Sequence, residues 1–210
     1  MSGSILVLPG GGYARLAPHE GEPVAEWLRG LGWSARVVEY PVGTRHPGPL
    51  NVVQRELAVE RAAGHDVVGV IGFSAGGHLA GHAALATEGP TRPDFAVLCY
   101  PVVAMDAATH RGSRDVLLGP RPSWWKKRAF SIDRMVTADS PPMFVWTTAE
   151  DKSVTPVDHT YRLGAALARH RVPHDLHVFA EGAHGLGFAE GIPAEAWRGL
   201  CERWLTRFAI

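Results

Sequence analysis

The most constraining feature of this sequence is a short glycine-rich segment between two stretches of opposite character. Residues 67–73 are almost continuously apolar, which is typical of a central parallel strand buried on both faces. Residues 78–86 follow with the pattern of a helix. Between them, Gly72-Phe73-Ser74-Ala75-Gly76 has to turn the chain sharply, and glycine permits the close backbone contacts that such a turn needs. The segment predicts a strand–turn–helix unit of a parallel sheet.

The rest of the chain repeats this alternation of strand and helix. Short apolar runs alternate with amphipathic stretches, which predicts the α/β class, with a mostly parallel central sheet and helices on both faces. The predicted strands are residues 5–8, 34–40, 67–73, 95–100, 143–147 and 174–179, and the predicted helices are residues 22–31, 50–63, 78–86, 156–169 and 193–208. Residues 101–141 contain no clear strand, and long connections often carry binding sites. The length fits a single domain over residues 1–210, without a cap domain.

The balance of charge limits the classes of partner. Lys plus Arg and Asp plus Glu both number 21, so we expect neither nucleic acid nor a membrane as partner, and a small-molecule substrate fits better. The early apolar run, residues 5–8, is too short for a signal peptide, and no stretch is long enough for a transmembrane helix. A cytoplasmic protein is therefore expected, in which Cys99 and Cys201 are buried thiols and not a disulfide.

Ser74 is the candidate nucleophile. A G-x-S-x-G pentapeptide between a strand and a helix is the pattern of a nucleophile elbow. The sharp turn would hold the serine in a strained conformation with its hydroxyl outward, and the start of the next helix would add positive potential. An ordinary Gly-Ser turn explains the pentapeptide equally well. The choice depends on whether the sequence supplies catalytic partners.

Such partners follow Ser74 in the order that the elbow pattern requires, first an acid and then a histidine. His184 lies in a glycine-bracketed loop between the last predicted strand and the last predicted helix, and is the candidate general base. Asp151 follows the strand at 143–147 and is the candidate orienting carboxylate. Glu150 is the alternative acid, and a turn or helix cap is the alternative role for Asp151.

A glycine-rich loop after the first strand offers hydrogen-bond donors for an oxyanion. We assign Gly11 and Gly12 to this oxyanion hole, together with the N–H of Ala75. A flexible turn or a nucleotide-binding loop would also be rich in glycine. Arg15 breaks the G-x-G-x-x-G pattern and no G-x-x-x-x-G-K-[ST] segment occurs, so a nucleotide is not favoured and no cofactor is expected.

Three aromatic residues are candidates for substrate binding. Tyr13 ends the glycine loop, and Trp124 and Trp125 lie in the long connection, where they could stack on a sugar ring or, alternatively, form a pocket wall or pack a helix. His78 and His82 have the i, i+4 spacing of a metal pair. The glutamate of a helical metalloprotease motif is absent and no third ligand is indicated, so no metal site is expected.

With these motifs in place, the sequence resembles the small α/β-hydrolase esterases of the hormone-sensitive-lipase-like and acetylxylan-esterase-like groups. The resemblance is carried by Pro9-Gly10-Gly11-Gly12-Tyr13, His19-Glu20-Gly21-Glu22-Pro23, Tyr40-Pro41, Gly72-Phe73-Ser74-Ala75-Gly76-Gly77-His78-Leu79-Ala80, Glu150-Asp151 and Gly182-Ala183-His184-Gly185. It implies a serine ester hydrolase that removes acetyl groups from sugars or xylo-oligosaccharides, or hydrolyses short acyl esters, through an acyl-enzyme on Ser74. Pro9 stands where lipase-like relatives have histidine, which favours the sugar-esterase branch.

Two other functions stay open at this point. A prolyl-oligopeptidase-like peptidase would share the serine, acid and histidine, although such enzymes usually carry a large additional domain for which 210 residues leave no room. A non-catalytic binding protein on the same fold is the third possibility. The loss of a candidate catalytic residue would favour it, and none is missing.

Overall fold

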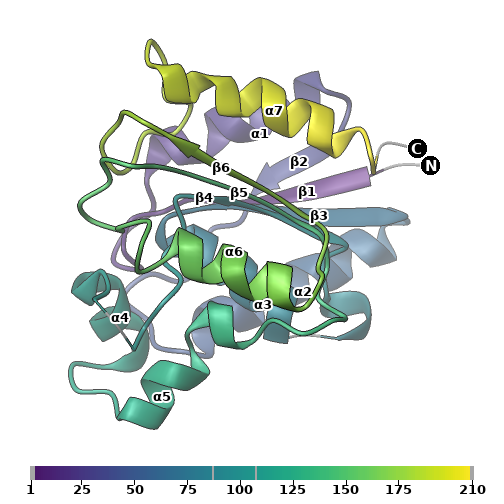
Figure 1. The fold of residues 1–210 in the computed structure, drawn as a ribbon. Coiled ribbons are helices and arrows are strands. Elements are labelled where there is room, and N and C mark those ends of the chain that lie inside the picture. Colours follow the sequence, from purple (N-terminus) through teal and green to yellow (C-terminus); the bar gives the residue numbers. More distant parts are fainter. Residues whose placement is uncertain (1–2, 87, 107, 209–210) are drawn as a thin grey trace.

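The computed structural model describes residues 3–86, 88–106 and 108–208, and within them six strands form one sheet in the order β2-β1-β3-β4-β5-β6 (Figure 1). The strands are β1 (Gly3–Leu8), β2 (Ser34–Val37), β3 (Val67–Phe73), β4 (Phe95–Cys99), β5 (Met143–Thr148) and β6 (His174–Phe179). Neighbouring strands all pair in parallel. The predicted α/β class with a parallel central sheet is therefore confirmed.

Helices cover both faces of the sheet (Figure 1). One face carries α1 (Glu22–Gly30) and α7 (Trp197–Leu205), and the other carries α2 (Gly48–Ala62), α3 (Ala75–Ala86) and α6 (Thr160–Arg169). Two further short helices, α4 (Arg111–Leu118) and α5 (Trp124–Ala129), lie away from the sheet within the long connection between β4 and β5. No described helix is long and apolar enough to cross a membrane.

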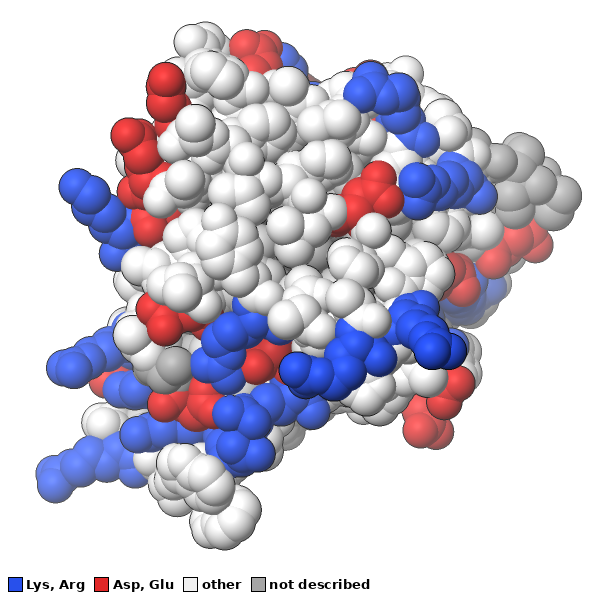
Figure 2. All heavy atoms as spheres, viewed as in Figure 1, with Lys and Arg blue, Asp and Glu red and all other residues white. Residues whose placement is uncertain are grey.

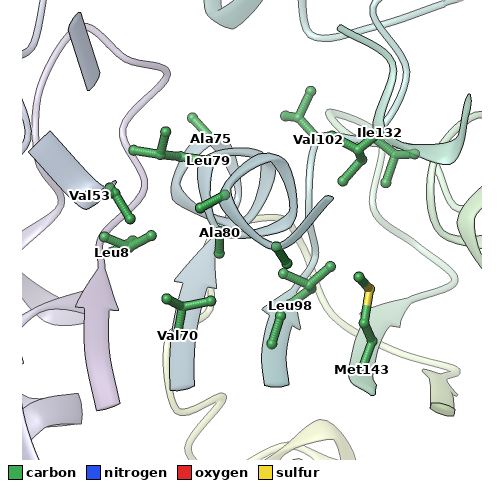
Figure 3. Close-up of a cluster of buried hydrophobic side chains, with 14 of the residues drawn as sticks. Leu8, Val53, Val70, Ala75, Leu79, Ala80, Leu98, Val102, Ile132 and Met143 are labelled. Atoms are coloured by element: carbon green, nitrogen blue, oxygen red, sulfur yellow. The ribbon is translucent and has the colours of Figure 1, made fainter. Parts of the chain in front are cut away.

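Each face of the sheet has its own hydrophobic core, because alternate residues of a strand point to opposite faces. In β1, Leu6 and Leu8 belong to the core under α2, α3 and α6, whereas Ile5 and Val7 belong to the core under α1 and α7. Figure 3 shows the first core, where side chains of α3 lie over those of the strands, as Ala80 does over Val70. Residues on both faces of β3 are buried, which the continuous apolar run predicted.

Several predicted boundaries differ from the structure. The strand predicted over 34–40 ends at Val37, because the chain leaves the sheet after the amide of Val38 has donated to the carbonyl of Val7. The helix predicted from residue 78 already begins at Ala75, and the one predicted from residue 156 begins only at Thr160, after a turn. A 3-10 turn at Pro193–Ala196 precedes α7. The two cysteines, Cys99 and Cys201, are free buried thiols, as predicted.

Parallel strands bring the segments that follow them to one edge of the sheet. The glycine loop follows β1, Ser74 follows β3, and Tyr100 follows β4. Asp151 follows β5, and His184 follows β6. Residues far apart in the sequence therefore meet at the carboxyl end of the sheet, where ligands bind in open α/β folds.

Besides His82 of α3, two buried histidines are held neutral on the α3 side of the sheet. His78 accepts the Tyr13 hydroxyl at Nδ1 (2.8 Å) and donates from Nε2 to the carbonyl of Phe130 (2.8 Å). His159 accepts two backbone amides at Nδ1, from Val103 (2.9 Å) and Ala104 (3.1 Å). Burial lowers the pKa of each histidine from 6.5 to about 4. Either ring would have to lose a hydrogen bond in order to take a proton at Nδ1.

These histidines predict that the protein loses stability in mild acid. The unfolded chain binds protons at both positions below about pH 6.5, but the folded protein does not bind them until about pH 4, so the free energy of unfolding falls as the pH is lowered between these values. We expect a slope of about 1.4 kcal/mol per pH unit for each histidine. Urea unfolding at a series of pH values measures it. The slope should be shallower in His159→Asn and unchanged in His170→Asn, which alters an exposed histidine; equal slopes in all three proteins would refute the assignment.

Candidate active site

Ser74 lies at the turn between β3 and α3, where its backbone is held from two sides. Its φ of 53° lies in the left-handed region, which residues with a side chain rarely adopt. Its amide donates to the carbonyl of Cys99 (2.9 Å), and its carbonyl accepts the amide of Val102 (3.1 Å). These bonds stabilise the strained conformation and leave the hydroxyl at the wall of a cleft.

Steric crowding requires glycine at both glycine positions of the pentapeptide. A β-carbon at Gly76 would lie 2.1 Å from the carbonyl oxygen of Leu8, and one at Gly72 would lie 2.2 Å from the carbonyl oxygen of Gly76. Neither distance is possible for a real β-carbon. The start of α3 therefore packs against the end of β1 at a distance that only glycine allows.

Ser74, His184 and Asp151 form one hydrogen-bonded line. The Ser74 hydroxyl oxygen lies 2.7 Å from Nε2 of His184, and Nδ1 of His184 lies 2.6 Å from Oδ2 of Asp151. The second oxygen of Asp151 accepts the amides of Ser153 (2.9 Å) and Val154 (2.8 Å). The Asp151 side chain is fully buried, and these amides keep its carboxylate aimed at the imidazole. This is the arrangement that activates a serine hydroxyl by general base catalysis.

Glu150, the alternative acid, points elsewhere. Its carboxylate accepts the amide of Gly182 at 3.1 Å, at the start of the loop that carries His184. The hydroxyl of Thr148 donates to the carbonyl of the same glycine at 2.6 Å. Glu150 thus fixes the loop of the histidine and does not contact its ring.

The glycine loop lies beside Ser74, with backbone angles that favour glycine. Gly11 and Gly12 have φ values of 117° and 68°. In the described part of the chain, their amides donate to no protein acceptor, and the amide of Ala75, the first residue of α3, has no partner in the preceding turn. Gly11, Gly12, Ser74 and His184 all line one cleft of about 430 Å³. These N–H groups are available to an anion that forms at Ser74.

A buried carboxylate connects the glycine loop to the histidine loop. Glu20 is 2% exposed, and it accepts the amide of Gly10 (2.8 Å) and the hydroxyl of Tyr100 (2.6 Å). The same hydroxyl accepts the amide of Gly187 (2.8 Å), three residues beyond His184. The Tyr100 ring also packs edge-to-face against the His184 ring, with centroids 5.1 Å apart. The sequence analysis missed this role of Glu20, because a long-range contact leaves no local pattern.

His110 is a second residue that the sequence analysis missed. Its ring lines the cleft and caps α4, accepting the amide of Ser113 at Nδ1 (3.2 Å). Because Nδ1 accepts, the neutral ring carries its proton on Nε2. The pKa of His110 is lowered by its burial and by the nearby His184. It is therefore a neutral hydrogen-bond donor at the wall of the cleft.

The assignment of Tyr13 to substrate binding is wrong. Tyr13 is fully buried, and its hydroxyl is bonded to His78 of α3. Its left-handed φ of 61° turns the side chain inward from the end of the glycine loop. It supports the loop from below and is not accessible to a substrate.

Trp124 and Trp125 do not line the cleft that contains Ser74. They lie on α5, where 53% and 74% of their surfaces are exposed, so they are neither a wall of this cleft nor packed in a core. His78 and His82 are buried in the α3 core, and no described group of three His, Cys, Asp or Glu side chains could hold a metal ion.

Comparison with known proteins gives a consistent set of similarities. A sequence model of the prolyl oligopeptidase family matches residues 50–201. Endo-1,4-β-xylanase B of Butyrivibrio fibrisolvens is 33% identical over 98% of this chain and 36% of its own length. The acetylxylan esterase of Xylanibacter ruminicola is 31% identical over 88% of this chain and 41% of its own length. The chain thus spans less than half the length of these curated relatives.

One solved structure matches over the whole of this chain. The acetyl ester-xyloside bifunctional hydrolase from Caldicellulosiruptor lactoaceticus superposes with a TM-score of 0.94 and is 38% identical, covering all of this chain and 84% of that one.

Proposed function

The chain belongs to the prolyl oligopeptidase family of α/β-hydrolases, and we propose that it is a serine esterase that removes acetyl groups from sugars, folded as a single domain. The observation that carries the proposal is the hydrogen-bonded line from Ser74 through His184 to the buried Asp151. It lies beside unpaired backbone amides in an open cleft.

The reaction proceeds in two halves. The Ser74 oxygen attacks the acetyl carbonyl while His184 takes its proton, and the oxyanion that forms accepts the amides of Gly11, Gly12 and Ala75. His184 then gives the proton to the leaving sugar oxygen, which leaves an acetyl group on Ser74. Water hydrolyses this acyl-enzyme with the same base and releases acetate. Asp151 selects the histidine tautomer and stabilises the imidazolium.

The relatives support acetylated sugars as the substrate class. Their names include an acetylxylan esterase and an acetyl ester-xyloside hydrolase, and the latter aligns with the whole of this chain. His110 adds a neutral N–H donor to the cleft, suited to a sugar hydroxyl. Arg15 and His19 add further polar groups to the same wall.

Peptide hydrolysis is the second candidate, because the matching family model is that of prolyl oligopeptidases. The catalytic line would serve either reaction, since both pass through an acyl-enzyme. The solved relative of 38% identity favours the ester. A non-catalytic binding role is disfavoured because the histidine lies within hydrogen-bonding distance of both the serine and the acid.

The central test removes the nucleophile. In Ser74→Ala we expect deacetylation of acetylated xylo-oligosaccharides to fall by about 10⁴-fold or more, with an unchanged thermal unfolding temperature. Acetate release measures the activity, and a peptide amide series run in parallel tests the alternative reaction. Near-normal turnover by the variant would refute the role of Ser74, and faster cleavage of peptides than of esters by the intact protein would favour the peptidase.

A second pair of variants separates the two neighbouring acids. Asp151→Asn should lower kcat by about 10⁴-fold, because the asparagine would favour the wrong histidine tautomer. Glu150→Gln should lower kcat far less, since its side chain bonds to the amide of Gly182 and not to the ring of His184. Measuring kcat for p-nitrophenyl acetate compares them. If the order of the two effects were reversed, Glu150 would be the orienting acid.

A third prediction concerns Glu20 as a positioning residue. Glu20→Gln replaces one of the two accepting oxygens with an NH₂ donor, so the bond to Gly10 or the bond to Tyr100 is lost and the loop that it holds should shift. We expect kcat to fall by about 10- to 100-fold with little change in KM, because an oxyanion donor is displaced. The control is Glu22→Gln, which alters an exposed carboxylate two residues away. A change in KM without a change in kcat, or equal effects of Glu20→Gln and Glu22→Gln, would contradict this role.

A further inference from the structure

We propose a second binding site next to the catalytic cleft, which holds a carboxylate carried by the sugar substrate. The site is a hollow of about 440 Å³ between α4, α5 and the loop after β5. Four cationic side chains line it, and only one carboxylate does; they are Arg111, Arg114, Lys127, Lys152 and Asp158. This inference rests on the proposed function, since it names the class of sugar that the esterase prefers.

The positive charge of this hollow is not balanced by its neighbours. Among the described residues, Arg111, Lys127 and Lys152 form no ion pair, and only Arg114 has one, with Asp115 at 3.1 Å. The one lining carboxylate, Asp158, already accepts the hydroxyl of Thr155 at 2.7 Å. Figure 2 shows Lys and Arg side chains gathered over the lower part of the molecule, where α4 and α5 lie in Figure 1. Because the whole chain is electrically neutral, a local excess of positive charge here is matched by an excess of negative charge elsewhere.

The cationic side chains of the hollow can bind an anion directly. A carboxylate held between arginine and lysine side chains forms charge-assisted hydrogen bonds.

The hollow is adjacent to the cleft through α4 and through the acid loop. His110 and Gly112 face the cleft, whereas Thr109 and Arg111 face the hollow. Lys152 directly follows Asp151, which orients His184. A sugar chain whose acetyl group lies at Ser74 can thus extend across the start of α4 and place an acidic side group in the hollow.

The exposed tryptophans extend the same surface. Trp124 and Lys127 are three residues apart on α5 and therefore lie on one face of it. Arg128 lies over the Trp124 ring at 4.9 Å, which fixes that ring beside the cationic side chains. An exposed indole beside a cation suits a sugar ring that carries a carboxylate, because the ring stacks on the indole and the charge pairs with lysine.

The experiment compares two acetylated xylo-oligosaccharides of equal length, one neutral and one with a single glucuronate side group. At low salt we expect the intact protein to show a KM about fivefold lower for the acidic oligosaccharide, as two exposed charge pairs would give. The preference should disappear in Arg111→Gln/Lys152→Gln and at about 0.5 M salt. Turnover of p-nitrophenyl acetate should stay the same in this double variant, which reports on its folding.

Two control variants make the result specific. Arg169→Gln alters a cation in a different hollow, of about 610 Å³, and should keep the preference. Arg15→Gln alters the cation that lines the cleft itself, and should also keep it. Loss of the preference in Arg15→Gln but not in the double variant would overturn the inference, because the carboxylate would then bind in the cleft.

The remaining outcomes separate this inference from the proposed function. Equal KM values for both oligosaccharides would refute the carboxylate site and leave the esterase intact. Failure to hydrolyse either one, with p-nitrophenyl acetate still cleaved, would refute the sugar substrate and this inference together. Binding of duplex DNA that depends on Arg111 and Lys152, without any preference between the oligosaccharides, would assign the hollow to nucleic acid instead.

Discussion

The close approach of α3 to the end of β1 is the constraint on which the rest of the site depends. The carbonyl groups of Leu8 and Pro9 lie where a β-carbon of Gly76 would be, so helix and strand ends are in direct backbone contact. This contact sets the serine hydroxyl beside the glycine loop, and it forces Ser74 into a left-handed conformation. The strain is offset by backbone bonds from Ser74 to Cys99 and Val102, which anchor the turn to β4 and to the segment after it.

Glycine residues permit many backbone conformations, but the glycine loop is held in one of them because buried polar side chains bind both of its ends. At one end, the amide of Gly10 is bonded to Glu20, and through Tyr100 to the histidine loop. At the other, the hydroxyl of Tyr13 is bonded to His78 within α3. Nucleophile, amides and base are therefore tied to one another beneath the cleft, so an acyl group would meet donors that need no rearrangement. Each tie uses a fully satisfied buried polar group, which is costly to disturb.

Features that depend on local pattern or on chain order could be predicted from the sequence. Features that depend on long-range contacts could not. The six strands, the elbow at Ser74, and the loops of Asp151 and His184 carry clear periodicity or glycine signals, and the structure brings these three side chains together. Tyr13 was misassigned because no local sequence pattern shows that its left-handed φ sends the ring inward. The short helices α4 and α5 were missed because eight and six residues give too little periodicity. The cap of α4, the His110 ring, is visible only in three dimensions.

The residues proposed for catalysis and those that can select a substrate lie in different parts of the chain. The side chains that we propose for catalysis follow strands of one parallel sheet, so their spacing is set by strand pairing and by two cores. The groups that can select a substrate, among them His110, Arg111 and Trp124, lie in the single long connection between β4 and β5. Its helices α4 and α5 begin at side-chain caps. Substitutions there can change which ester is bound without moving the serine, the histidine or the acid, which is how one hydrolase scaffold serves many substrates.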